Sequence, residues 1–372
     1  MPGKEFYMKM ALQLAESVVG QTSPNPPVGC VVVKDGKIIG IGAHMKAGEP
    51  HAEVNALVEA GEKAKGADLY VTLEPCSHTG KTPPCADLII RKKVKSVYIA
   101  SMDPNPLVAG KGADRLRTAG IFVESGICEH ISKELYKHYF YYIRTKTPFV
   151  TLKTAVTFDG KTAASSGNSK WITSKEARMD VHEYRHRHDA ILVGVNTVLV
   201  DNPHLTTRLP QGGIHPIRIV LDTHLNMPLH AHMLHDGAAP VIVVCGKGAE
   251  QSRQDALEQQ GVKVKRMPSD MIHIDSLLKW LGNEQITSLF VEGGSAVHSS
   301  FIQARAFQEI IMYMAPTILC DAKGHPAFGG PPKELIKEGT PIAFQSVEKM
   351  GPDIKITAVP KEGGEDDIYG DC

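Results

Sequence analysis

Apolar and polar residues alternate with two different periods along the first 146 residues. In residues 5–19 the apolar side chains recur every third or fourth position, which predicts an amphipathic helix. Short apolar runs bounded by glycine, proline or charged residues predict strands, and the first two flank a KDG turn as a hairpin. The predicted strands are 29–33, 37–42, 67–75, 94–106 (ending in a turn) and 121–126, and the further helices are 51–64, 85–93 and 112–120. This order predicts an α/β layered domain over residues 1–146.

A second series of apolar runs begins at residue 147 and predicts another α/β domain, over residues 147–360. The predicted strands are 147–161, 189–194, 216–222, 239–246, 288–294 and 309–316, and the clearest helices are 174–188 and 251–261. No internal repeat relates the two series, so we expect two different domains fused in one chain. The last residues, 361–372, are acidic and glycine-rich, and we expect them to be disordered.

The composition narrows the classes of function. A chain of 372 residues with 42% hydrophobic and 22% charged residues is typical of a globular protein with two full cores. Lys plus Arg equals Asp plus Glu at 41 each, so the chain lacks the basic excess of a broad nucleic-acid surface. No apolar run approaches the ~20 residues that span a bilayer, and the N-terminus lacks a signal-peptide core. We expect a cytoplasmic homo-oligomer that acts on small molecules and has no nucleic-acid or membrane partner.

The stretch TLEPCSHTGKTPPC, residues 72–85, contains two cysteines that could bind a metal. The chain has seven scattered cysteines, and in a reducing compartment paired thiols are more often metal ligands than disulfides. Cys85 precedes a helical run, whose positive end favours the thiolate that binds metal. Upstream, His51 and Glu53 follow a proline, which indicates a helix entrance where both side chains reach one pocket. One imidazole and two thiolates leave the fourth position of a tetrahedral zinc open.

The order H-x-E, then P-C and a second cysteine, is the signature of zinc deaminases. It makes His51, Cys76 and Cys85 the candidate zinc ligands and Glu53 the candidate proton shuttle. Bound zinc lowers the pKa of water toward ~7, so hydroxide is available at neutral pH. Glu53 would take the water proton and deliver it to the ring nitrogen and the leaving ammonia. The simpler alternative is a surface histidine and two loop cysteines without a function.

Eight residues, SHTGKTPP, separate the two cysteines, whereas nucleobase deaminases usually have C-x-x-C. With this spacing, the motifs PNPPVGCVVV, GAHMKAGEPHAEVNAL, TLEPCSHTGKTPPCADLI and MDPNPLVAGKG resemble the deaminase half of the bifunctional riboflavin-biosynthesis deaminase/reductase. The resemblance implies a cytidine-deaminase-like α/β/α domain with one Zn²⁺. It implies a substrate pocket lined by Asn25, His44, His78 and Lys81. The implied substrate is the diaminopyrimidinone ribotide made from opened GTP, which loses its ring amine as ammonia.

The second half has neither G-x-G-x-x-G nor a P-loop pattern. An apolar strand does run into Gly293-Gly294-Ser295 and then a helical pattern, which could present free backbone N–H groups to a phosphate. A Gly-Gly turn between a strand and a helix is often only structural, so this signal alone is weak.

VTLKTAVTFDGKTA, SKWITS, ILVGVNTVLVDNPHLTTR and VEGGSAVHSSF resemble the reductase half of the same enzyme, whose α/β fold is like dihydrofolate reductase. The resemblance implies NADPH as a cofactor. Its implied binding residues are Ala155, Trp171, Thr197, Asp201, Thr223 and a loop of Gly294, Ser295, Ala296, Val297, His298, Ser299 and Ser300. The implied residues for the reductase substrate are Ser169, Arg185, Leu205, Arg208 and Glu292.

The implied reaction is hydride transfer to the sugar C1 atom after the ribosylamine opens to an imine. Such a step needs a positioned proton donor and charges that stabilise the opened form. Lys153 and Asp201 are the candidates, although each could be an ordinary exposed charge. Trp171 could equally belong to the core. His182 and His186, four residues apart in HEYRHRH, are interpreted as a solvated helix face rather than a metal site.

Two other functions stay open from the sequence. A tRNA or cytidine deaminase with an unrelated second domain would share H-x-E and P-C, but it should show C-x-x-C, and a tRNA enzyme is typically basic. A non-enzymatic protein stabilised by zinc should show a closed site with four ligands, and the sequence offers three.

Overall fold

The computed structural model describes residues 2–77, 83–106 and 108–361, and the chain forms two compact units. The first unit extends to Phe149 and includes Lys279–Ser288, and the second comprises Val150–Leu278 and the chain from Leu289. Apart from Lys361, the expected tail 361–372 lies outside the described residues. Within the described residues, no helix has the length and apolar character needed to cross a bilayer.

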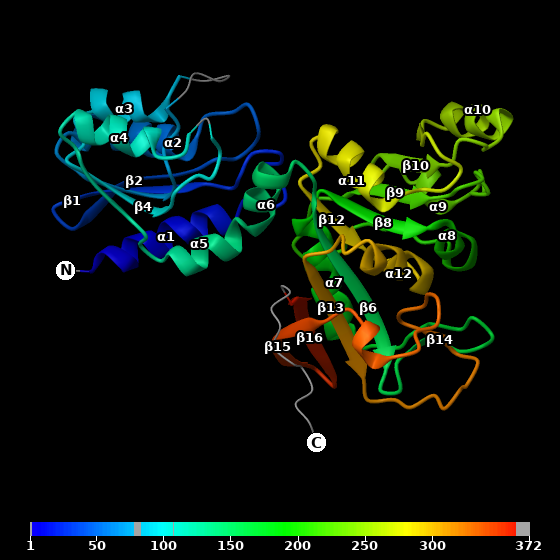
Figure 1. The fold of residues 1–372 in the computed structure, drawn as a ribbon. Coiled ribbons are helices and arrows are strands. Elements are labelled where there is room, and N and C mark those ends of the chain that lie inside the picture. The colour runs from blue at the N-terminus through cyan, green and yellow to red at the C-terminus, as the bar shows by residue number, and fades with distance from the viewer. Residues whose placement is uncertain (1, 78–82, 107, 362–372) are drawn as a thin grey trace. The chain divides into compact units, whose positions relative to one another are not determined.

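The first unit is built on a five-stranded sheet with the order β2-β1-β3-β4-β5 (Figure 1). The hairpin of β1 and β2 is antiparallel, as predicted, and β1 is also antiparallel to β3, whereas β3, β4 and β5 are parallel. The strands are β1 (Gly29–Lys34), β2 (Lys37–Ala43), β3 (Asp68–Leu73), β4 (Ser96–Ser101) and β5 (Phe122–Ser125). The helices are α1 (Lys4–Glu16), α2 (Ala52–Ala60), η1 (Gly61–Ala64), α3 (Cys85–Arg91), α4 (Lys111–Thr118), α5 (Glu129–Leu135) and α6 (Lys137–Thr145).

Helices cover both faces of this sheet. Successive strand residues point to opposite faces. Cys30 and Val32 of β1 pack with buried residues of α2, α3 and α4, whereas Val31 and Val33 pack with α1 and the residues before α5. Figure 1 shows α2, α3 and α4 on one face and α1 and α5 on the other. Burial on both faces explains the continuous apolar runs and confirms the predicted α/β/α layers.

Gly42 in β2 allows α2 to lie unusually close to the sheet. A Cβ atom at Gly42 would lie 2.3 Å from the carbonyl oxygen of Ala52 and 2.6 Å from the nitrogen of Ala56. Any side chain there would push α2 away from the sheet. The first turn of α2, which carries Glu53 and follows His51, is therefore held at a fixed distance from the sheet.

The second unit is built on a nine-stranded sheet with the order β11-β10-β9-β8-β12-β6-β13-β16-β15. The pairs β11/β10, β10/β9, β9/β8, β8/β12 and β6/β13 are parallel, and β16 and β15 add antiparallel strands at one edge. The strands are β6 (Phe149–Thr157), β8 (Ala190–Gly194), β9 (Ile217–Leu221), β10 (Val241–Cys245), β11 (Lys263–Arg266), β12 (Ser288–Val291), β13 (Glu309–Ala315), β15 (Ile342–Met350) and β16 (Asp353–Pro360). A separate pair joins β7 (Lys161–Ala163) to β14 (His325–Pro326).

Helices connect most of these parallel strands. They are α7 (Lys175–Arg187), α8 (Val195–Asp201), α9 (His232–His235), α10 (Gln251–Gln259), α11 (Ile274–Asn283) and α12 (Ser295–Gln303), with a 3₁₀ turn η2 (Ile336–Glu338). Buried side chains of α7, α8 and α10 form one core with inward residues of β8, β9, β10, β12 and β13. The loops after the carboxyl ends of parallel strands are where α/β proteins place their ligands. Several expected site residues follow β8, β9 and β12.

Candidate active sites

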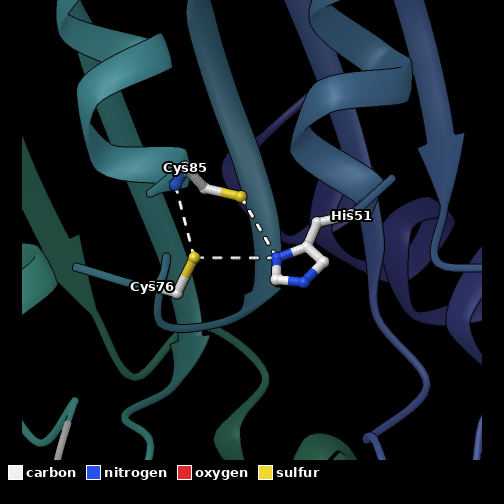
Figure 2. Close-up of side chains that lie close together, drawn as sticks. All are labelled: His51, Cys76 and Cys85. Atoms are coloured by element: carbon white, nitrogen blue, oxygen red, sulfur yellow. Dashed lines mark hydrogen bonds between the residues drawn. The ribbon is translucent and has the colours of Figure 1, made fainter. Parts of the chain in front are cut away.

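Three side chains of the first unit meet at one point (Figure 2). The Sγ atom of Cys85 lies 3.3 Å from Nδ1 of His51, and the Sγ atom of Cys76 lies 3.6 Å from the same nitrogen. The backbone N–H of Cys85 donates a hydrogen bond of 3.3 Å to the sulfur of Cys76. In Figure 2 both sulfurs and the nitrogen point toward one another. The structure thus brings together the three predicted ligands, which lie far apart in the sequence.

Two of these side chains, His51 and Cys85, stand at helix starts. His51 is the N-cap residue of α2 and Cys85 is the first residue of α3, which confirms the predicted helix entrances. The positive ends of both helices favour negative charge at the cluster. A hydrogen bond with the Cys85 thiol outweighs burial and, with His51, lowers the pKa of Cys76, whereas the same hydrogen bond and burial raise the pKa of Cys85. The cluster therefore favours a thiolate at Cys76, and a bound cation would stabilise the second thiolate at Cys85.

The distances fit zinc. With Zn–S near 2.3 Å and Zn–N near 2.0 Å, a tetrahedral site places sulfur and nitrogen ligands roughly 3.6 Å apart. The observed separations of 3.3 and 3.6 Å are close to this value, and both cysteines are free thiols. Among the described residues, His51, Cys76 and Cys85 supply three ligands of a tetrahedron, and a fourth position left for water is typical of catalytic rather than structural zinc.

Glu53 lies beside the cluster, in the first turn of α2, and only 3% of its surface is exposed. Burial, reinforced by the negative charge of Cys76, raises the pKa of Glu53 to about 7. A carboxyl group with such a pKa can both accept and donate a proton near neutral pH. Its environment therefore suits a proton shuttle.

A cavity of about 400 Å³ opens in front of the cluster and is lined in part by His51, Glu53 and Cys76. Asn25 and His44 line it as well, with Nδ2 of Asn25 3.1 Å from Nε2 of His44. The cavity is large enough for a pyrimidine ring with a substituent.

His44 is held as a neutral acceptor toward Asn25. Its Nδ1 lies 3.2 Å from the carbonyl oxygen of Pro50, so a proton on Nδ1 satisfies both contacts. Burial lowers the pKa of His44, which favours this neutral form. The other two expected substrate residues, His78 and Lys81, lie outside the described residues.

The cavity is also lined by residues for which the sequence indicated no role, namely Glu74, Asp103, Asn105, Val108 and Tyr139. The hydroxyl of Tyr139 donates to the carboxylate of Asp103 at 3.2 and 3.3 Å. Asp103 and Asn105 lie within the MDPNPLVAGKG motif and Glu74 within TLEPC. Both motifs supported the resemblance, but no role followed for these residues.

In the second unit, Glu292 follows β12 and joins two cations. Arg185 of α7 binds it with two nitrogens at 2.6 and 3.1 Å, and Lys153 of β6 lies 3.3 Å from it. Burial raises the pKa of Glu292, but the charges of Arg185 and Lys153 outweigh it and lower the pKa to about 2. Three of the expected residues therefore form one charged cluster.

The solvated helix face predicted for HEYRHRH is wrong. Both His182 and His186 are partly buried, and each Nδ1 accepts a backbone N–H, from Arg208 at 3.3 Å and from Ile214 at 3.0 Å. Arg185, from the same helix, donates to the carbonyl oxygen of Thr206 at 3.0 Å. This face of α7 therefore holds the segment that carries Arg208.

Two helices begin at the carboxyl ends of the neighbouring strands β8 and β12. Gly194 is the N-cap of α8 and Gly294 the N-cap of α12, so free N–H groups of both helices lie at one edge of the sheet. A Cβ atom at Gly293 would lie 2.6 Å from the Val297 side chain. Such a glycine-lined edge with helix N-termini suits the phosphates of a dinucleotide.

The expected cofactor loop is largely helix, because α12 begins at Ser295 and only Gly294 precedes it. His298 and Ser299 are buried on this helix, and Nε2 of His298 lies 3.3 Å from the carbonyl oxygen of Val291. The other expected cofactor residues lie in β6, in α8 and after β9, and they are Ala155, Thr197 and Thr223.

Trp171 does not belong to the core, so that alternative is wrong. Its side chain is 70% exposed, and the guanidinium of Arg178 lies 4.5 Å from the centroid of the Trp171 ring. Asp201, the last residue of α8, lies 3.7 Å from Nζ of Lys170, whereas Lys153 pairs with Glu292. The two candidate proton donors therefore have different ionic partners. Ser169 lies in the segment before α7, and Leu205 is buried after α8.

Both units match models of known protein families. Residues 1–101 match the cytidine and deoxycytidylate deaminase zinc-binding region, and residues 148–356 match the RibD C-terminal domain. The riboflavin biosynthesis protein RibD of Bacillus amyloliquefaciens is 48% identical over 98% of this chain and 99% of its own length. The chain belongs to the RibD family.

Other RibD proteins agree along the whole chain. RibD of Escherichia coli is 41% identical over 94% of this chain and 97% of its own length. The solved structure of Acinetobacter baumannii RibD, form 1, has a TM-score of 0.87 and 39% identity, with 96% of this chain and 99% of that chain covered. A deaminase/reductase structure from Thermotoga maritima has a TM-score of 0.85 and 39% identity, with coverages of 96% and 98%.

The family confirms the main expectations from the sequence. A RibD protein is a bifunctional enzyme of riboflavin biosynthesis, with a zinc-dependent deaminase and an NADPH-dependent reductase. The cytidine-deaminase-like first fold and the reductase fold of the second part are confirmed as well. The tRNA deaminase and the non-enzymatic zinc protein are therefore no longer needed as explanations.

Proposed function

We propose that residues 1–146 form the deaminase and residues 147–360 the reductase, each with its own active site. In the deaminase, His51, Cys76 and Cys85 would hold Zn²⁺, which supplies a hydroxide-like water at neutral pH. The observation that carries this proposal is the convergence of the three ligand atoms, all within 4.8 Å of one another, beside a buried glutamate.

Glu53 performs the proton transfers in this proposal. Its carboxylate accepts one proton of the attacking water and gives it to the ring nitrogen. It then takes the second proton, from the hydroxyl group now bonded to the ring carbon, and gives it to the amine, which leaves as ammonia while the carbonyl forms. Asn25 and neutral His44 face the pyrimidine and fix its orientation. His78 and Lys81 complete the pocket, with Lys81 suited to the ribose phosphate.

In the reductase, the N–H groups at Gly294 and along the first turn of α12 bind phosphate groups of NADPH, which delivers a hydride when bound. Ala155, Trp171, Thr197, Asp201 and Thr223 complete the cofactor site, with Ser295, Ala296, Val297, His298, Ser299 and Ser300 on the helix. Ser169, Arg185, Leu205, Arg208 and Glu292 hold the substrate. Lys153 and Asp201 are the candidate proton donors for the opening of the ribosylamine.

Localisation and assembly complete the proposal. The enzyme works in the cytoplasm on small pyrimidine ribotides, without nucleic-acid or membrane partners. It forms a homo-oligomer, and the edge strand β15 supports this because Phe344 is 71% and Val347 64% exposed.

The decisive test separates the two activities in the full-length, zinc-loaded protein. Glu53→Gln should lower the rate of ammonia release from the diaminopyrimidinone ribotide by about 100-fold or more, since general acid–base catalysis contributes at least this much. Oxidation of NADPH with the deaminated ribotide should stay at the wild-type rate. Glu62→Gln, at a fully exposed side chain near the same helix, is the control. Loss of both activities in a folded Glu53→Gln protein would overturn the two-site proposal.

A further inference from the structure

Glu74 is a buried carboxylate with four backbone donors. Its Oε2 accepts the N–H of Gly110 at 3.0 Å and that of Asp103 at 3.4 Å. Its Oε1 accepts the N–H groups of Gly112 at 3.0 Å and Ala113 at 3.1 Å. Only 4% of Glu74 is exposed, so water does not replace these partners easily. Both oxygens are used by main-chain donors, so this carboxylate is not placed to move protons as Glu53 is.

These contacts join two parts of the deaminase pocket. Glu74 directly follows β3 and stands two residues before Cys76. Its four donors belong to the segment between β4 and the first turn of α4, which supplies Asp103, Asn105 and Val108 to the cavity wall. A single side chain therefore connects the segment that carries a predicted zinc ligand with the segment that carries Asp103, Asn105 and Val108 of the cavity wall.

The segment of Glu74 and Pro75 and the first turn of α4 lie so close together that no side chain fits between them at Gly112. A Cβ atom at Gly112 would lie 2.0 Å from the carbonyl oxygen of Pro75 and 3.3 Å from Oε1 of Glu74. The wall is fixed from its other side by the hydroxyl of Tyr139, which donates to Asp103. Asp103 in turn accepts the N–H of Asn105 at 2.8 Å. The position of Asp103 and Asn105 therefore depends on Glu74 at one end and on Tyr139 at the other.

We propose that Glu74 is a positioning residue of the deaminase: its carboxylate sets the pocket wall of Asp103, Asn105 and Val108 at the distance from the His51–Cys76–Cys85 cluster that the pyrimidine ribotide requires. The inference rests on the proposed deaminase function. The chemistry belongs to Glu53 and the cluster: His51, Glu53 and Cys85 stand at the starts of α2 and α3, and the backbone N–H of Cys85 holds the sulfur of Cys76. A displaced wall therefore weakens substrate binding more than it slows the reacting step.

The test uses Glu74→Gln in the full-length, zinc-loaded protein. The amide NH₂ then faces two N–H groups that lose their acceptor. We expect KM for the ribotide to rise about tenfold or more while kcat changes less than about threefold, the pattern of lost uniform binding. Zinc content should stay at the wild-type level. Hydrogen–deuterium exchange should become faster at the amides of Gly110, Gly112 and Ala113.

Two further variants serve as controls for Glu74→Gln. Asp114→Asn removes an exposed carboxylate of α4 and should change neither KM nor exchange. Glu74→Asp retains the charge on a shorter side chain and should give a smaller rise in KM, and it replaces the Gln variant if that variant does not fold. An unchanged KM, or a loss of zinc together with kcat, would overturn the positioning role. If the wild-type chain released no ammonia, the proposed function itself would fail, and the exchange data would still report on the contacts of Glu74.

Discussion

Glu292 shows how much a single residue of the reductase site depends on its neighbours. Its side chain is only 10% exposed and is neutralised by Arg185 and Lys153. Removing one partner from a buried ion pair leaves the other charge uncompensated. We expect Arg185→Met to destabilise the second unit by about 3 kcal/mol, because Glu292 would lose two charge-assisted hydrogen bonds and the buried cluster would keep only the contact with Lys153. Urea-induced unfolding measures this loss of stability, with hydrogen exchange at the amides of α7 and β12 as the readout for the second unit.

The triple variant Arg185→Met, Glu292→Gln and Lys153→Met tests the cause. It removes all three charges of the cluster, and we expect it to recover about half of the lost stability or more. Arg187→Met, at an exposed position of the same helix, is the control. If the triple variant were no more stable than Arg185→Met, the loss would come from packing rather than from charge.

At the scale of single residues, the sequence identifies a functional residue when only a few residue types can perform its role. His51, Glu53, Cys76 and Cys85 were found because a metal and a proton shuttle demand these types in a known order. Glu74 was not found, because its partners are backbone N–H groups 29 to 39 residues away. Backbone donors leave no trace in the residue types, so such contacts become visible only in three dimensions.

At the scale of elements, the segment from Thr206 to Ile214 is held by three histidine side chains that accept backbone N–H groups. Nδ1 of His182, His186 and His215 accepts the N–H groups of Arg208, Ile214 and Thr207, at 3.3, 3.0 and 3.2 Å. Burial and the charges of Arg185 and Arg208 lower the pKa of His182 from 6.5 to about 4. Protonation would turn this acceptor into a donor and break the contact.

Acid should therefore loosen this segment. Between about pH 6.5 and 4 the unfolded chain binds a proton at His182 that the folded chain does not, so stability falls as pH falls through this window. We expect a loss of about 1 kcal/mol between pH 7 and 5, since the imidazole is partly exposed and screened. Amide exchange of the segment 205–214 at both pH values measures this. His182→Asn keeps an acceptor near the Nδ1 position and should flatten the pH dependence, whereas His230→Asn, at an exposed site, should not.

The elements that the sequence predicts are those with continuous apolar runs between turn residues. β1, β8, β10 and β12 are almost fully buried and were all predicted. β15 was missed because nearly all of its residues are exposed, so it has no alternating pattern, and α5 and α6 were missed as well. Hydrophobic periodicity detects only elements that bury one face in their own chain.

At the scale of the whole molecule, one chain carries two enzymes, and the sequence indicated both because each has its own motifs in its own half. Those motifs say nothing about assembly between chains. An exposed apolar strand at the edge of the nine-stranded sheet does indicate it. β15 ends the order of the nine-stranded sheet, and an edge strand with apolar side chains can pair with another chain.

We therefore expect the protein to be a homo-oligomer that associates through β15. Light scattering after size-exclusion chromatography should give a mass at least twice the 40.4 kDa of one chain. Val347→Lys places a charge on the edge strand, where Val347 is 64% exposed, and should shift the protein toward the monomer. Met271→Lys makes the same kind of change at a site that is 72% exposed between β11 and α11, and the mass should stay unchanged. A monomeric wild-type protein would contradict the homo-oligomer, and an oligomer insensitive to Val347→Lys would place the interface on another surface.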